Sequence, residues 1–74
     1  MVKREFEALQ LTLSENIRRL RRQQGLSQER LALEAGVDRT LVSKIERVIA
    51  NPTLEILVKL AVILDVPVSR LLKD

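Results

Sequence analysis

Basic side chains gather in the middle of this 74-residue chain. Residues 17–47 contain eight Lys and Arg against four Asp and Glu, and the chain as a whole carries a formal charge of +3. A local excess of positive charge attracts an anionic partner to that segment. Lys and Arg neutralise phosphates, and the two-pronged guanidinium of Arg can also bind the edge of a guanine. The chemistry that these residues favour is recognition of a nucleic acid.

The residue types needed for most catalytic and metal chemistry are missing from the sequence. There is no Cys and no His, and the carboxylates are spread singly along the chain. The usual nucleophile–base pairs and the commonest metal ligands are therefore absent. We predict that the protein is not an enzyme and binds no cofactor or metal ion. Phe6 is the one aromatic residue, which argues against single-strand and many RNA-binding modes because these stack bases on aromatic rings.

The apolar runs of the sequence are short. None approaches the ~18 apolar residues of a membrane span. Residues 1–13 carry four charges and lack the apolar run of a signal peptide. We therefore expect a cytoplasmic protein without a membrane partner, and no pattern in the sequence indicates a small-molecule ligand.

Helical periodicity extends over almost the whole chain, and only two Pro and two Gly interrupt it. Apolar residues recur at spacings of three and four, N-cap residues precede several of these runs, and glycines follow two of them. The expected helices span residues 14–24, 27–35, 38 to 46 or 47, 53–64 and 68–72, with a loop at 48–52. The predicted fold class is an all-α domain of five helices.

The start of the first helix is ambiguous. Apolar residues continue the helical stripe N-terminal to Ser14, with spacings of 3, 4, 4 and 3. These residues are Phe6, Leu9, Leu13, Ile17 and Leu20. Residues 1–13 therefore either extend the first helix or form a separate arm before a domain at 14–72.

Two short helices joined by a tight turn occupy residues 27–47. The turn is Gly36-Val37-Asp38, and the small residues Ala35 and Gly36 allow the two helices to approach closely. This is the helix-turn-helix arrangement, in which the second helix enters the major groove of duplex DNA.

The segments "LSQERLALEAGVDRTLVSKIER" and "PTLEILVKLAVILDVPVSRLL" resemble the Cro/C1-type (XRE-like) helix-turn-helix DNA-binding domain. The resemblance extends over about residues 14–72 and rests on many matches in order, among them Ser27-Gln28, Ala35-Gly36-Val37 and Ile45-Glu46. It implies a five-helix Cro/C1 repressor-like fold and a role in transcription regulation. Within the family, "VDRTLVSKIER" is similar to the controller proteins of restriction–modification systems, which are dimeric autoregulators.

The resemblance also implies roles for individual residues. Arg39 and Thr40 stand at the principal base-reading positions, where Arg39 fits a guanine edge and Thr40 a thymine methyl group, a base or a phosphate. Gln28 stands where the family contacts a phosphate and braces the second helix of the motif. The later contact positions on that helix, which reach base edges or backbone, are Ser43, Lys44 and Arg47.

Other charged residues have interpretations of their own. Within the cluster at 18–22, Arg21 and Arg22 are the candidates for phosphate contacts. Asp38 is interpreted as a helix cap, and Glu46 as the partner of an arginine on the first helix. Arg39 lies in a first helical turn, where the helix dipole disfavours a cation. Without a local benefit, its presence there favours an external anion or a guanine.

Val48 departs from the family pattern. The family usually has a Gly at this position, where the chain turns left-handed, and a valine is costly at positive φ. We therefore expect the loop to follow a different path, which places the phosphate contacts of that loop in doubt.

The helix at 53–64 is apolar on more than one face, which predicts a second surface of contact. A single 74-residue domain contacts few base pairs, and small domains without disulfides or a structural metal often form oligomers. We expect a homodimer whose interface is formed by Ile56, Leu60, Ile63, Val66, Val68 and Leu72. The alternative is that the N-terminal arm, through Phe6 and Leu9, covers this face.

Together these features predict a sequence-specific transcriptional regulator that binds duplex DNA as a homodimer on a palindromic operator. The competing hypothesis is a protein-interaction module with the same fold, such as an antitoxin. A nonspecific nucleoid protein is a third hypothesis, which predicts binding independent of sequence.

Overall fold

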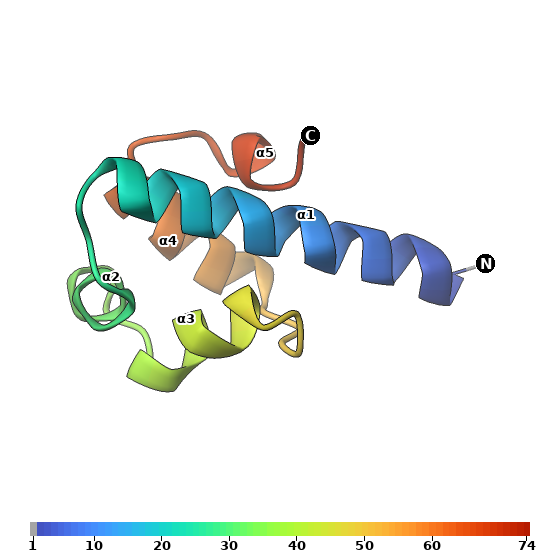
Figure 1. The fold of residues 1–74 in the computed structure, drawn as a ribbon, viewed down its shortest axis with the longest axis horizontal. Helices are drawn as coiled ribbons and strands as arrows, with labels where there is room; N and C mark the ends of the chain where they lie inside the picture. The colour runs from blue at the N-terminus through green and yellow to red at the C-terminus, as the bar shows by residue number, and fades with distance from the viewer. Residues whose placement is uncertain (1) are drawn as a thin grey trace.

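Residues 2–74 are described by a computed structural model and form five helices (Figure 1). The helices are α1 (Val2–Gln23), α2 (Gln28–Ala35), α3 (Arg39–Glu46), α4 (Leu54–Leu64) and α5 (Val68–Leu71). The expected all-α class with five helices is confirmed, and apart from the start of α1 the boundaries agree to within one residue.

The N-terminal residues extend α1 instead of forming a separate arm. α1 runs unbroken over 22 residues, and its first turns project beyond the other helices (Figure 1, blue). Phe6 and Leu9 are 38% and 47% exposed. The apolar stripe is therefore continuous, but only its part from Leu13 onward is buried in the core.

The core lies between the five helices. Ile17 of α1, Leu31 of α2 and Val42 of α3 are each 0% exposed, as are Leu60 of α4 and Leu71 of α5. Every helix thus contributes at least one fully buried side chain. Because burial of such a side chain contributes about 1.5–3 kcal/mol, these contacts across helices hold the short α2, α3 and α5 in place.

Leu60 was wrongly assigned to the expected dimer interface. It lies on the stripe of α4 that also holds Leu57, Ala61 and Leu64, and that stripe faces the core of its own chain. A helix with apolar residues on several sides does not indicate which side faces inward. The outer side of α4 instead exposes Leu54 and Val62, by 69% and 68%.

Polar side chains define where the helices begin. Ser27, Asp38 and Thr53 are the N-caps of α2, α3 and α4, and each side chain accepts a backbone N–H from the first turn of its helix. These hydrogen bonds satisfy donors that have no partner within the helix. The expected cap at Asp38 is confirmed.

The C-terminal ends of α1 to α4 share one geometry. After each of α1 to α4 the chain passes through a left-handed residue, at Gly25, Gly36, Val48 and Asp65. The backbone N–H of that residue and of the next one bond back into the last turn, as in Val48 to Ile45 O and Ile49 to Lys44 O, both 3.0 Å. This is the Schellman motif, which satisfies the last carbonyl groups of a helix.

The expectation that the loop after α3 follows another path is wrong. Val48 has φ of 63° and takes the left-handed conformation in spite of its branched Cβ. The two backbone hydrogen bonds of the Schellman motif hold it there, at a strain cost of about 1–3 kcal/mol. The loop path typical of a glycine is therefore kept without the glycine.

Polar side chains on α1, and one just after it, bind backbone groups in distant parts of the chain. Asn16 Nδ2 donates to the carbonyl oxygens of Leu71, the last residue of α5, and of Lys73, both at 2.9 Å. Gln24 Nε2 donates to Leu64 O at the end of α4 (2.7 Å), and Gln10 Nε2 donates to Ala50 O in the loop after α3 (2.8 Å). These hydrogen bonds join α1 and the residue after it to the ends of α4 and α5 and to the loop after α3.

Candidate nucleic-acid interface

α2, the turn and α3 present one face of α3 to solvent. The inner face is buried through Val42, Ile45 and Glu46. The outer face carries the residues that the sequence singled out: Arg39, Thr40, Lys44 and Arg47 are exposed, and Ser43 is half-buried. A short helix with a locked inner face and a cationic outer face has the shape and charge needed to enter a major groove.

Glu46 anchors the C-terminal end of α3. Its carboxylate accepts hydrogen bonds from Arg21 Nε (2.7 Å) and Nη2 (3.0 Å), and from Gln28 Nε2 (3.0 Å). Its backbone oxygen accepts from Ser14 Oγ (2.7 Å) and Arg18 Nη2 (2.8 Å). The expected pairing of Glu46 with an arginine of the first helix is confirmed, and the network joins α1, α2 and α3.

The protonation of this network follows from its hydrogen bonds. Burial by itself would raise the pKa of Glu46, but the hydrogen bonds from Arg21, Gln28 and Arg18 reverse that effect and lower the pKa below its ordinary value. The hydrogen bond to Glu46 raises the pKa of Arg21. Both groups are therefore charged at neutral pH, and the pair remains intact.

Arg21 is not a free phosphate ligand, which corrects the expectation from the sequence. The residue is only 9% exposed, and while Nε and Nη2 bind Glu46, its Nη1 donates to Leu26 O at 2.8 Å. An arginine that neutralises a buried carboxylate cannot leave it without a large penalty. Arg22, one residue on, is exposed and remains a candidate for phosphate.

Gln28 occupies the junction between α2 and the end of α3. Its side chain is half-buried, and its Nε2 binds the carboxylate of Glu46. This contact gives Gln28 the bracing role that the resemblance implied. The second N–H of its side-chain amide and its backbone N–H in the first turn of α2 are the donors that remain for a phosphate.

The N-terminal end of α3 is held by Asp38 and Thr40. Asp38 Oδ1 accepts from the Thr40 hydroxyl (2.7 Å) and from the Thr40 backbone N–H (2.8 Å). Both hydrogen bonds lower the pKa of Asp38, and the one from the hydroxyl has the larger effect. Because the Thr40 hydroxyl donates to its own cap, its methyl group and its oxygen lone pairs are left for a base.

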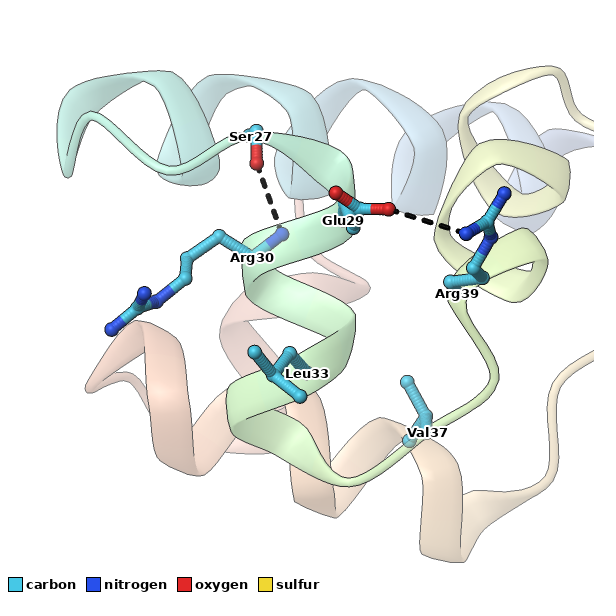
Figure 2. Close-up of a pocket in the computed structure, with 6 residues that line it drawn as sticks. All are labelled: Ser27, Glu29, Arg30, Leu33, Val37 and Arg39. Atoms are coloured by element: carbon cyan, nitrogen blue, oxygen red, sulfur yellow. Dashed lines mark hydrogen bonds and ion pairs between the residues drawn. The ribbon is translucent and has the colours of Figure 1, made fainter.

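Arg39 has a local partner that the sequence analysis missed. Its Nη1 donates to Oε2 of Glu29 on α2 at 3.4 Å (Figure 2). Both residues line an open groove between α2 and the start of α3, together with Ser27, Arg30, Leu33 and Val37. The unfavourable position of Arg39 against the helix dipole is therefore partly offset within the chain. No pattern in the sequence indicates this pair, because ten positions separate the residues and they lie on different helices.

The other residues of the expected dimer interface lie at the surface of α4, α5 and their connections. Ile56, Ile63, Val66, Val68 and Leu72 are half-buried and pack against the core from outside. Leu72 also lines an apolar groove with Phe6, Leu9 and Pro52, where the α1 extension passes the loop after α3. Apolar surface is thus available on this side of the molecule.

No helix within residues 2–74 has the length and the apolar character needed to cross a membrane.

Comparison with known proteins places these features in a family. The helix-turn-helix family HTH_3 matches residues 17–71. The control protein C.SmaI of Serratia marcescens is 40% identical over 67 residues, which cover 90% of this chain and 80% of that protein.

Solved structures agree with this match. The crystal structure of the hypothetical transcription factor NHTF from Neisseria has a TM-score of 0.85 at 42% identity, covering 88% of this chain and 75% of that chain. The restriction–modification controller protein C.AhdI from Aeromonas hydrophila has a TM-score of 0.80 at 39% identity, covering 84% and 94%. The family assignment made from the sequence is confirmed: the chain belongs to the helix-turn-helix family of Cro/C1-type DNA-binding transcriptional regulators.

Proposed function

We propose that the protein recognises a specific duplex sequence by inserting α3 into the major groove. The single observation that carries this proposal is the exposed outer face of α3, with Arg39 and Lys44, on a helix whose inner face is fixed by Glu46. Arg39 binds the O6/N7 edge of a guanine, and Thr40 packs its methyl group on a thymine. Ser43 and Lys44 contact bases or backbone one turn later.

Phosphate contacts on either side of α3 orient it in the groove. Gln28 at the start of α2, Arg47 after α3 and Arg22 on α1 are the residues proposed for this role. Contacts of this kind supply affinity and register without reading sequence. The exposed cations on α3 also favour DNA over a protein partner, because a protein-binding face here would be apolar or acidic.

The binding unit is proposed to be a homodimer. Two copies related by a two-fold axis place two α3 helices about 34 Å apart, which is one turn of DNA, and so match a palindromic operator. The interface is proposed to use the half-buried apolar residues at the surface of α4 and α5, namely Ile56, Ile63, Val66, Val68 and Leu72. A self-complementary patch of this kind is what a two-fold dimer requires.

The biological role is proposed to be control of a restriction–modification promoter. C.SmaI and C.AhdI, which are named as control or controller proteins of this kind, match most of this chain and most of their own length. The protein would act by occupying DNA and not by catalysis, and it would work in the cytoplasm, where its operator lies. Dimer formation makes occupancy rise steeply with protein concentration, which suits a timed switch.

Selection of bound sites from a pool of random duplexes tests the proposal. We expect an enriched pseudo-palindrome whose two half-sites are centred about 10 base pairs apart. At ~150 mM salt the enriched site should bind at least about a thousandfold more tightly than a scrambled duplex of the same length. Equal binding of both duplexes would instead support a nonspecific role, and no binding of either would support a protein partner.

A further inference from the structure

Glu29 faces Arg39 across the junction of α2 and α3 (Figure 2). The two side chains are 74% and 76% exposed, so the pair lies outside the core. An exposed ion pair at 3.4 Å contributes little to the stability of a fold. The position of the pair, at the first turn of both helices of the motif, therefore suggests a contribution to binding.

A carboxylate at this point opposes DNA binding by itself. In a helix-turn-helix complex the starts of α2 and α3 lie closest to the duplex, so the charge of Glu29 approaches the phosphates. Repulsion between like charges lowers the affinity for every sequence alike. The chain nevertheless carries this carboxylate beside the residue proposed to read a base.

The carboxylate restricts what Arg39 can bind. A free arginine on a flexible stem can pair with any nearby phosphate, and phosphates are present at every position of a duplex. If Arg39 swung to a phosphate, Glu29 would be left without its cation in a site from which docking excludes water. The pair also occupies only Nη1, so Nε and Nη2 still have donors for the guanine edge.

We propose that Glu29 is a positioning residue that holds the Arg39 guanidinium toward base edges and away from phosphates, and so exchanges general affinity for discrimination between sequences. The proposal rests on the function proposed above, in which α3 lies in the major groove. Glu29 is a repulsive element that disfavours the wrong partner, and specificity commonly uses such elements beside attractive ones.

The chain contains a matched control in Glu34. Glu34 also lies on α2 and forms an ion pair, with Arg30 one turn away on the same helix. Figure 2 shows Arg30 directed to the side of α2 opposite to Arg39. Glu34→Gln therefore removes the same charge from the same helix without freeing Arg39.

The test measures binding of the full chain to its selected operator and to a scrambled duplex at ~150 mM salt. Glu29→Gln should bind the scrambled duplex roughly threefold more tightly, the effect of one exposed charge pair. Its ratio of specific to nonspecific affinity should fall roughly three- to tenfold, part of what one base contact supplies. The salt slope for the scrambled duplex should steepen by about 0.9, because Arg39 gains one phosphate. Glu34→Gln should leave the affinity ratio unchanged.

A double-mutant cycle identifies the route of the effect. In an Arg39→Ala background, Glu29→Gln should no longer change the ratio, because the residue that Glu29 positions is gone. A ratio that falls equally in both backgrounds would overturn the proposal and assign Glu29 a base contact of its own, such as a cytosine amino group.

Failure of this inference is distinguishable from failure of the proposed function. If the wild type discriminates between the duplexes and Glu29→Gln keeps the same ratio, the inference alone is overturned. If the wild type does not discriminate, the proposed function is overturned and the inference falls with it. Circular dichroism of each variant confirms that the fold is retained.

Discussion

The carboxylate of Glu46 receives hydrogen bonds from three side chains on two other helices, and it is almost completely buried. This carboxylate contributes more to the orientation of α3 than to net stability, because a buried ion pair is seldom more stabilising than well-packed apolar residues in its place. The network fixes the C-terminal end of α3 relative to α1, and the cap of Asp38 fixes the other end. Individual polar residues therefore determine how the outer face of α3 is presented.

Replacement of Glu46 by Gln should destabilise the fold in a pH-dependent way. At pH 7 the variant leaves the buried Arg21 without its anion, which should lower the free energy of unfolding by about 3 kcal/mol. The pKa of Glu46 is lowered in the folded state, so its contribution is complete above the unfolded value of about 4.3 and is lost as the pH falls through the folded value.

Urea denaturation of both proteins at a fixed concentration, from pH 7 down to pH 3, measures this difference. We expect the gap between wild type and variant to narrow as the solution becomes acidic. A gap that stays constant over the whole range would show that the charge of Glu46 is not what stabilises the pair.

Substitutions of Arg39 and Arg47 should distinguish base recognition from phosphate binding. Arg39→Ala should cost about 1–3 kcal/mol of discrimination while weak general binding persists, because a guanine contact is lost. Arg47→Ala should weaken binding to operator and scrambled duplex by the same factor, because a phosphate contact carries no sequence information. Titration of both duplexes with each variant is the measurement. An unchanged preference in Arg39→Ala would remove that residue from base reading.

At the scale of elements, α3 and α5 pack against α1, whereas α2 packs mainly against α3 and α4. Asn16 on α1 and Gln24 just after it bind carbonyl groups at the ends of α5 and α4, and the apolar stripe of α1 enters the core. Helices as short as α2 and α3 are marginal alone in water. They depend on packing against neighbouring helices, on their caps and on the left-handed residues that follow them.

The left-handed turn after α3 offers a test of stored strain. Val48→Gly should raise the free energy of unfolding by about 1 kcal/mol, because relief of strain at positive φ exceeds the added entropy of glycine in the unfolded chain. Asp65→Gly, at the equivalent turn after α4, should gain less because Asp tolerates this conformation better. Thermal or urea denaturation compares the three proteins, and a less stable Val48→Gly variant would contradict the strain argument.

At the scale of the whole molecule, the apolar surface around α4 and α5 bears on the proposed dimer. Leu72→Asp or Ile63→Asp should give a monomer and abolish tight operator binding, because a charge cannot be buried in the interface without a partner. Val62→Asp is the matched control. Val62 lies on α4, as Ile63 does, but it is on the outer side of the helix, outside the proposed interface, and is 68% exposed.

Sedimentation velocity at micromolar concentration gives the oligomeric state, and circular dichroism checks the fold of each variant. We expect the wild type and Val62→Asp to be dimers. A monomeric wild type would reject the dimer, whereas a monomeric Val62→Asp would move the interface to the outer side of α4.

Local signals in the sequence were enough to predict the helices and the motif. Ser27, Asp38 and Thr53 act on backbone groups within three residues of themselves, and Gly25 and Gly36 act on their own φ. Such effects depend on neighbouring residues along the chain and can therefore be predicted from the sequence. The same holds for the exposed outer face of α3, which follows from helical periodicity.

Contacts between helices were decided only by the tertiary structure. The burial of Arg21 against Glu46, 25 positions away, and the pairing of Arg39 with Glu29 both depend on how separate helices are oriented. The choice of Leu60 for the core has the same origin, because α4 has apolar residues on several sides and packing selects one of them. Periodicity fixes which residues share a face of one helix, but only the packed arrangement fixes what that face meets.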